Sequence, residues 1–166
     1  MSNRTIENLL AAFAGESQAN RKYTAFARKA EEEGHKQAAR LFRAAAHAEA
    51  IHAANHLKAA GKVLSTKENL ETALGGENYE VKTMYPPMLA EAEQAGEKKA
   101  ATSFRWALEV EKVHAMLYHM ALELLGKEEN GDDYYVCPFC GYTHKGKLEG
   151  KCPVCKAPAE KFERIS

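Results

Sequence analysis

Glu49-Ala50-Ile51-His52 places a carboxylate and an imidazole three residues apart inside a long alanine-rich stretch, and the same spacing recurs at Glu111-Lys112-Val113-His114. Such alanine-rich stretches favour the α-helix. On a helix, residues i and i+3 share one face, so each pair can direct an oxygen and a nitrogen at the same point. Two such pairs on facing helices would enclose a metal ion.

Length and composition indicate one helical core with a small appendage. The chain has 166 residues, of which 45% are hydrophobic and 28% charged. Its 23 basic and 23 acidic residues are interspersed, which argues against a nucleic-acid or anionic membrane partner. No stretch approaches the roughly 18 apolar residues of a membrane span, and the N-terminal segment lacks the apolar run of an export signal. We therefore expect a cytoplasmic protein.

Apolar residues at spacings of three and four predict four helices, each followed by a glycine. They run over about 4–33, 36–61, from 65 to Gly96, and 97–125. In the third, Ser65 and Glu68 have the spacing of a capping box, Gly75-Gly76 indicates a break or a close backbone approach, and Pro86-Pro87 predicts a kink. We expect a helical domain over 1–130 and a second domain over 131–166, separated by the acidic linker 127–133.

Each predicted helix carries ionisable residues in the middle of its apolar face. A single such residue is more often a core side chain satisfied by a hydrogen bond. Burying five carboxylates without cations, however, would cost several kcal/mol per charge, against a total stability of about 5–15 kcal/mol. An oxygen-rich set with two imidazoles suits iron or manganese, and we favour iron. The set consists of Glu16, Glu49, His52, Glu77, Glu80, Glu111 and His114.

The four cysteines form two CxxC pairs, Cys137/Cys140 and Cys152/Cys155, with 11 residues between them. In a chain without an export signal this spacing predicts a tetrathiolate metal site rather than disulfides. Zinc and iron both fit the pattern, and attachment to a di-iron domain favours iron, since zinc has no redox chemistry. Lys156 stands where a glycine often follows the second pair, which predicts slight strain in that turn.

Four stretches and the two cysteine pairs resemble the rubrerythrin family over essentially the whole chain. The stretches are GESQANRKYTAFA (15–27), EAIHA (49–53), GENYEVKTMYPPM (76–88) and EVEKVHA (109–115). The resemblance implies a mainly α fold, in which a ferritin-like four-helix bundle precedes a small rubredoxin-like domain. It also implies a carboxylate-bridged pair of irons and a third iron bound by the four cysteines.

The resemblance further implies a role for each residue of the carboxylate set. Glu49 and Glu111 would bridge the two irons, and Glu77 and His114 would complete one of them.

The second iron would be completed by Glu16 and, depending on its redox state, by Glu80 or His52. Glu80 is additional to the four-Glu, two-His template. Tyr23 and Tyr85 match family tyrosines that hydrogen-bond the ligating carboxylates.

The activity implied by the resemblance is reduction of hydrogen peroxide to water, protecting the cell from oxidative stress. Electrons would come from an external NAD(P)H-linked protein through the cysteine-bound iron, because the chain has no nicotinamide-binding motif. The alternatives are a ferroxidase or oxygenase that uses O2, an iron-storage protein, and a zinc-stabilised interaction module.

The short connection between the second and third helices predicts an exchanged homodimer. A ferritin-like bundle needs a long crossover at this point, here about 36 Å, whereas residues 62–66 reach only about 17 Å when extended. We therefore expect helices 1–2 of one chain to pair with helices 3–4 of the other, with a hinge near Gly61 to Ser65.

Overall fold

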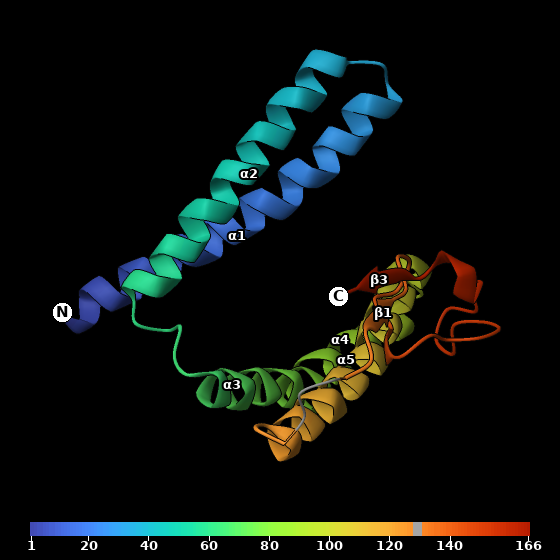
Figure 1. Ribbon diagram of the computed structural model, residues 1–166. Coiled ribbons are helices and arrows are strands. Elements are labelled where there is room, and N and C mark those ends of the chain that lie inside the picture. Colours follow the sequence, from blue (N-terminus) through green and yellow to red (C-terminus); the bar gives the residue numbers. More distant parts are fainter. Residues whose placement is uncertain (128–130) are drawn as a thin grey trace. The chain divides into compact units, whose positions relative to one another are not determined.

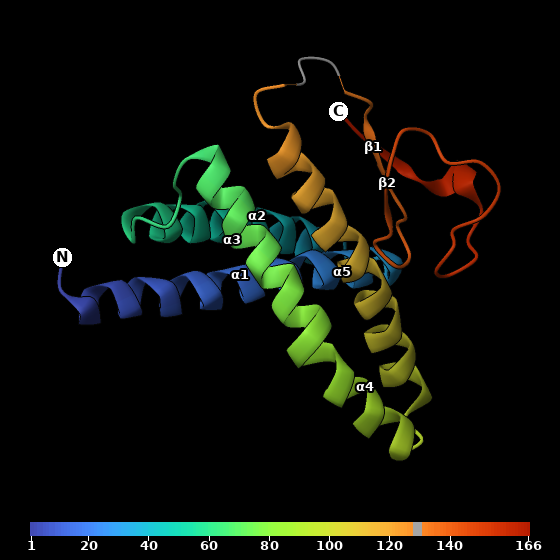
Figure 2. The ribbon, with the colours of Figure 1, turned by 90° about the horizontal axis from the view of Figure 1, so that it is seen from below.

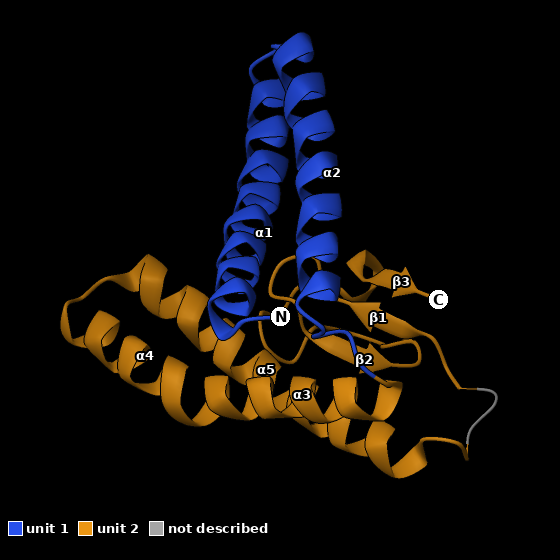
Figure 3. Cartoon of the chain, turned by 90° about the vertical axis from the view of Figure 1, so that its left-hand side faces the viewer, with its two compact units in different colours: residues 1–64 blue, residues 65–166 orange. Residues whose placement is uncertain are grey.

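The computed structural model describes residues 1–127 and 131–166. Its contacts divide the chain into two compact units, residues 1–64 and 65–166 (Figure 3). The predicted linker, 127–133, includes residues 128–130, which lie outside the described residues. No helix in the described ranges is both long enough and apolar enough to cross a membrane.

The first unit is an antiparallel pair of long helices, α1 (Asn3–Glu32) and α2 (Lys36–Ala59) (Figure 1). Every buried residue of these two helices is an alanine, which allows the two backbones to approach closely. Asn20 Nδ2 donates a hydrogen bond of 2.6 Å to the Ala46 carbonyl oxygen and so links the two helices near their middle. This contact helps to set which residues of α1 face which residues of α2.

The predicted helix ends are confirmed, because Gly34, Gly61, Gly96 and Gly126 all have positive φ close after a helix. At Gly61, where φ is 66°, the backbone N–H donates to Lys58 and the next N–H donates to Leu57. This is the Schellman arrangement, which satisfies carbonyl groups that the helix leaves unpaired.

The second unit begins with three consecutive helical segments that pack along α5 (Lys98–Leu124) (Figure 2). They are α3 (Thr66–Tyr79), the π-helical η1 (Glu80–Met84) and α4 (Tyr85–Gln94). The predicted capping box is confirmed, since Ser65 accepts from the Glu68 backbone N–H and the Glu68 carboxylate accepts from the Ser65 backbone N–H.

The prediction of a break or close approach at Gly75-Gly76 is wrong for this chain. The α3 helix continues through both glycines, and a Cβ built on either would have no neighbour within 4 Å. Helical hydrogen bonds use only the backbone, so two glycines lower the helix propensity without removing the helix.

The irregularity predicted at Pro86-Pro87 takes the form of the π-helical segment η1 immediately before them. Proline lacks the N–H that would bond the carbonyl four residues earlier. In this segment the hydrogen bond spans five residues: the Tyr85 N–H donates to the Glu80 carbonyl oxygen. Glu80 opens this segment, and single π turns often occur at functional sites.

The C-terminal part of the second unit is a small antiparallel sheet carrying the cysteine turns. Its strands are β1 (Tyr134–Val136), β2 (Thr143–Lys145) and β3 (Glu163–Ile165), in the order β2-β1-β3, and a short 3-10 helix, η2 (Ala159–Lys161), precedes β3. The two cysteine turns have matching hydrogen bonds. Gly141 N–H donates to Cys137 at 2.9 Å, and Lys156 N–H donates to Cys152 at 3.0 Å.

Lys156 is strained, as its sequence position suggested. Its φ is 64°, whereas Gly141, at the matching place in the first turn, has φ of 82°; no other non-glycine among the described residues has positive φ. We predict that Lys156→Gly raises the free energy of unfolding of the metal-loaded protein by about 1 kcal/mol in denaturant titrations. The left-handed conformation costs a non-glycine residue roughly 1–2 kcal/mol, and the greater freedom of glycine in the unfolded chain offsets part of the gain.

The matched control is Gly141→Ala, which introduces the same strain at the first turn and is expected to lower stability. Lower stability of Lys156→Gly would contradict the prediction. It would show that the 2.8 Å hydrogen bond from Lys156 Nζ to the Pro153 carbonyl outweighs the backbone strain.

Candidate metal centres

The first unit brings three of the predicted ligands together. Ligand atoms of Glu16, Glu49 and His52 all lie within 4.8 Å of one another. His52 Nδ1 is 2.9 Å from Glu49 Oε2, as the i, i+3 spacing on one helix predicts. Glu16 comes from α1 and joins them through the packing of the two helices. The His52 side chain is 54% exposed within this unit.

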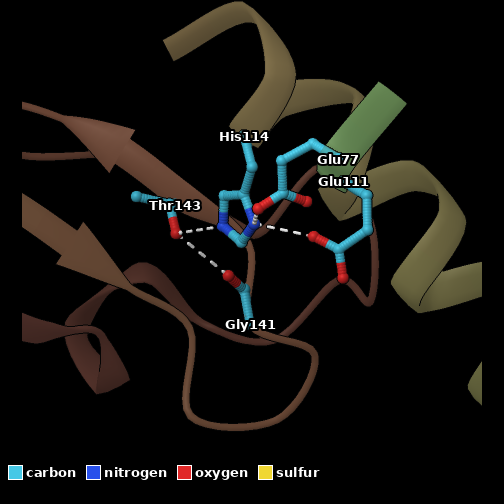
Figure 4. A network of polar contacts seen from close by, with 5 residues as sticks. All are labelled: Glu77, Glu111, His114, Gly141 and Thr143. Carbon is cyan, nitrogen blue, oxygen red and sulfur yellow. Dashed lines mark hydrogen bonds and ion pairs between the residues drawn. The ribbon is translucent and has the colours of Figure 1, made fainter. Parts of the chain in front are cut away.

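The second unit contains a corresponding group, formed by Glu77, Glu111 and His114, whose ligand atoms also lie within 4.8 Å of one another. His114 Nδ1 is 2.7 Å from Glu111 Oε2 and 3.9 Å from Glu77 Oε1 (Figure 4). The helix α5 supplies Glu111 and His114, and α3 supplies Glu77. This group is less exposed than the first, with His114 at 28%.

A bound cation would stabilise the neighbouring carboxylates of the second group. Burial, and then repulsion from Glu111, raise the pKa of Glu77 to about 7. Two carboxylates at this separation cannot both be ionised cheaply in a partly desolvated place. A divalent cation would remove that cost, and two carboxylates with one imidazole are suitable ligands for iron. The residues present therefore fit a metal ion.

Glu80 lies beside this group, although it is outside the set of atoms within 4.8 Å. Its pKa is raised by burial and by the charge of Glu111, and His114 opposes the shift. Tyr85 is also close, since its pKa is raised first by burial and then by the carboxylates, of which Glu80 contributes most. The proximity of Glu80 and Tyr85 agrees with their expected places near the irons.

Tyr23 belongs to the first unit, where its ring packs 6.3 Å from Phe26 and 6.2 Å from Phe42, measured between ring centroids. Neither Tyr23 nor Tyr85 makes a hydrogen bond to a carboxylate among the described residues. The hydrogen bonds expected of these two tyrosines therefore stay predictions.

The four cysteines form a separate cluster with the geometry of a metal site. They are free thiols with all four sulfurs within 4.8 Å, and the Cys137–Cys155 and Cys140–Cys152 sulfur pairs are each 3.6 Å apart. Four sulfurs about 2.3 Å from one ion in a tetrahedron would be about 3.8 Å apart. Burial raises the pKa of the Cys140 thiol, so a cation is needed to hold it as a thiolate.

Sequence reasoning missed Thr143, whose Oγ1 lies 2.9 Å from His114 Nε2. Thr143 follows the first cysteine pair by three residues, and nothing in its spacing relates it to a histidine 29 positions earlier. Only the folded second unit brings the two side chains together.

Comparison with known proteins agrees with these two kinds of site. The rubrerythrin family model matches residues 7–122, and the model of the rubredoxin-like domain of rubrerythrins matches residues 135–163. Nigerythrin of Nitratidesulfovibrio vulgaris is 40% identical over 95% of this chain and 85% of its own length. A rubrerythrin of Porphyromonas gingivalis is 37% identical over 97% of this chain and 90% of its own length.

Solved structures of nigerythrin are also similar to this chain. Nigerythrin in its fully reduced, all-ferrous state has a TM-score of 0.60 and 37% identity, over 99% of this chain and 88% of that chain. A mixed-valence nigerythrin structure has a TM-score of 0.59 and 38% identity over the same shares.

The fold and the two donor sets define a ferritin-like di-iron protein with a rubredoxin-like iron domain. The chain belongs to the rubrerythrin family. The predicted fold class is therefore confirmed, as are its cofactors, a di-iron site and one iron bound by four cysteines. Family members are oxidoreductases. The assignment of individual ligands stays a prediction.

The raised pKa of Glu77 predicts a pH-dependent stability of the metal-free protein. An acid with a higher pKa in the folded state keeps a proton that the unfolded chain releases, so the free energy of unfolding should fall as pH rises from the ordinary glutamate value to about 7, and then level off. We expect Glu77→Gln to show a smaller slope in denaturant titrations across this range.

The control is Glu91→Gln, which alters an exposed glutamate in α4 and should keep the wild-type slope. Saturation with a divalent cation should remove the slope in the wild type. A flat profile of the metal-free wild type would refute the electrostatic description of this group.

Proposed function

We propose that the chain is a peroxidase that reduces hydrogen peroxide to two waters with two electrons and two protons. The observation that carries the proposal is the presence, in one chain, of two carboxylate–histidine groups and a separate four-cysteine site. When bound, the two irons supply the two electrons that cleave the O–O bond. An iron held by the four cysteines would supply one-electron transfer from an external NAD(P)H-linked donor protein.

The residues of this chain hold and tune those centres. We assign Glu49 and Glu111 as the bridging carboxylates, and Glu77 and His114 as the remaining ligands of one iron. Carboxylates balance the charge of the oxidised pair, whereas a neutral imidazole suits the reduced pair.

At the other iron, Glu16 would be a constant ligand, and Glu80 or His52 would complete the ligand set depending on the redox state. The position of Glu80 in a π-helical segment is consistent with a ligand that moves. We place the activity in the cytoplasm, since two CxxC pairs that bind a metal instead of forming disulfides suit a reducing compartment.

Rapid mixing of the fully reduced protein with hydrogen peroxide or with O2 tests the activity, with the absorbance of both iron centres followed in the visible range. We expect fast oxidation of both centres by peroxide and slow oxidation by O2. If oxidation by O2 is faster than oxidation by peroxide, and the absorbance of the cysteine site does not change, the peroxidase proposal fails. The protein would then be a ferroxidase or oxygenase with zinc in the cysteine site.

The variant Cys140→Ser tests the roles of the two centres separately. In a single turnover its reduced carboxylate site should still be oxidised by peroxide. Steady-state turnover with an NADH-linked donor should fall by more than the roughly 10–100-fold that loss of a partner around a metal ligand costs. Lys156→Gly is the control, because it changes a cysteine turn without removing a ligand. Full donor-linked turnover of Cys140→Ser would exclude the proposed electron route.

We further propose that the protein is a homodimer that exchanges helices 1–2 and 3–4. Residues 60–65 alone connect α2 to α3, and they span only about 20 Å when extended. The two carboxylate–histidine groups belong to different units. The helices of the first unit bury only alanines and leave large apolar side chains exposed, which a second chain would cover: Phe26, Leu41 and Ile51.

Each di-iron site of the exchanged dimer would combine ligands of two chains. One chain would supply Glu16, Glu49 and His52, and the other would supply Glu77, Glu80, Glu111 and His114.

Complementation tests the exchange. Glu49→Ala chains and Glu111→Ala chains should each be inactive alone. After co-refolding, each mixed dimer of an exchanged protein has one site with both substitutions and one intact site, so roughly a quarter of wild-type peroxidase activity should return. Without exchange every site contains one substitution, and no activity returns. A fully active monomer in solution would also refute the exchange.

A further inference from the structure

The hydroxyl of Thr143 lies between His114 and the first cysteine turn, all within the second unit (Figure 4). Its Oγ1 is 2.9 Å from His114 Nε2 and 3.1 Å from the Gly141 carbonyl oxygen. Gly141 directly follows Cys140 in the sequence. Two hydrogen bonds therefore connect the imidazole to the backbone of the turn that carries a cysteine.

The Thr143 hydroxyl has a single proton to donate, which determines the direction of both hydrogen bonds. A carbonyl oxygen only accepts, so Thr143 gives its single hydroxyl proton to Gly141. The contact with His114 must then be a bond that Nε2–H donates to Thr143 Oγ1. A neutral imidazole with its proton on Nε2 has a free electron pair on Nδ1.

Nδ1 faces the carboxylates. Glu111 Oε2 lies 2.7 Å from Nδ1 and Glu77 Oε1 lies 3.9 Å from it, on the side of the ring away from Thr143 (Figure 4). The 2.7 Å contact is a hydrogen bond in the metal-free site, and a metal ion bound at Nδ1 would take the place of its proton. Metal-binding histidines usually donate their other ring N–H to a fixed acceptor, which sets both the tautomer and the ring orientation. His114 has this arrangement.

His52 provides a contrast within the same chain. Its Nδ1 contacts Glu49 at 2.9 Å, but among the described residues of its unit no hydrogen bond reaches its Nε2. Its side chain is about twice as exposed as that of His114. The Nε2 acceptor is thus a feature of one carboxylate–histidine group and not of both.

The position of Thr143 depends on the cysteine turn. Thr143 begins β2 and pairs with Val136 of β1, directly before Cys137. The turn between them is closed by bonds from Gly141 N–H to Cys137 and from Cys137 N–H to Tyr142, each 2.9 Å long. Small cysteine sites of this kind acquire their fold from the bound metal. An ion in the cysteine site would therefore also hold the hydroxyl in place.

We propose that Thr143 is a positioning residue through which the metal-filled cysteine site holds His114 in the metal-binding tautomer. The two metal sites are then thermodynamically coupled: an ion at the four cysteines raises the affinity of the Glu77–Glu111–His114 group for its own ion. By linkage, the reverse effect has the same size. The inference rests on the proposed role of His114 as a ligand, but not on the reaction with peroxide.

The test compares Thr143→Val, which removes both hydrogen bonds at nearly constant shape, with Thr143→Ser, which keeps the hydroxyl. Thr143 borders a cavity of about 330 Å³, lined also by Leu70 and Leu117, which leaves room for the second methyl group of valine. Binding of Mn2+, which prefers oxygen and nitrogen ligands, is measured on the full chain by electron paramagnetic resonance, with and without one equivalent of Zn2+.

In the wild type and in Thr143→Ser, Zn2+ should tighten Mn2+ binding by about 10-fold or more, the range for a partner around a metal ligand. In Thr143→Val the effect of Zn2+ should disappear. Equal Mn2+ affinity with and without Zn2+ in the wild type would overturn the proposal, and so would an undiminished effect in Thr143→Val.

A second measurement does not depend on Mn2+. Nitrogen-15 spectra of the chain with Zn2+ in the cysteine site report whether Nε2 of His114 carries a proton. The wild type and Thr143→Ser should show a fully protonated Nε2, and Thr143→Val should show a partly protonated one. A fully protonated Nε2 in Thr143→Val would overturn the proposal. If these results hold but peroxide is not reduced, the proposed function fails and the positioning role stands.

Discussion

Burial of neighbouring carboxylates is the constraint on which the rest of this structure depends. In the second unit, burial raises the pKa of Glu77, and repulsion from Glu111 adds to the effect. A helical protein tolerates such a group only if a cation is bound there or a proton is shared. This unfavourable free energy arises where ligand atoms of two carboxylates and one imidazole lie within 4.8 Å of one another, an arrangement that can bind a metal ion.

The helices are built to bring these groups together. Alanines at the contact of α1 and α2 let the backbones approach, and the hydrogen bond from Asn20 to Ala46 links the helices one turn from Glu16. In the second unit the irregular backbone at η1 falls at Glu80, beside the carboxylates rather than far from them. The same short stretches of the chain therefore provide both helix-packing contacts and candidate metal ligands.

The cysteine site and the carboxylate site of the second unit are not independent modules. The sheet that presents the first cysteine turn also presents Thr143, and Thr143 contacts a predicted iron ligand on α5. Cysteine-bound iron and carboxylate-bound iron differ in ligand chemistry and in the number of electrons they exchange. A hydrogen-bonded connection between them gives the chain a means of relating the state of one site to the geometry of the other.

The sequence by itself determined the features that follow from local geometry. Glu49 meets His52, and Glu111 meets His114, because the helix alone places residues i and i+3 together. The cysteine turns, the capping box at Ser65 and the helix ends at glycines are local in the same sense. Only the tertiary structure decided that Glu16 and Glu77 join those pairs, and that Thr143 lies within hydrogen-bond distance of His114. These contacts join residues far apart in the chain, and the packing of whole elements, which no short spacing encodes, sets their distances.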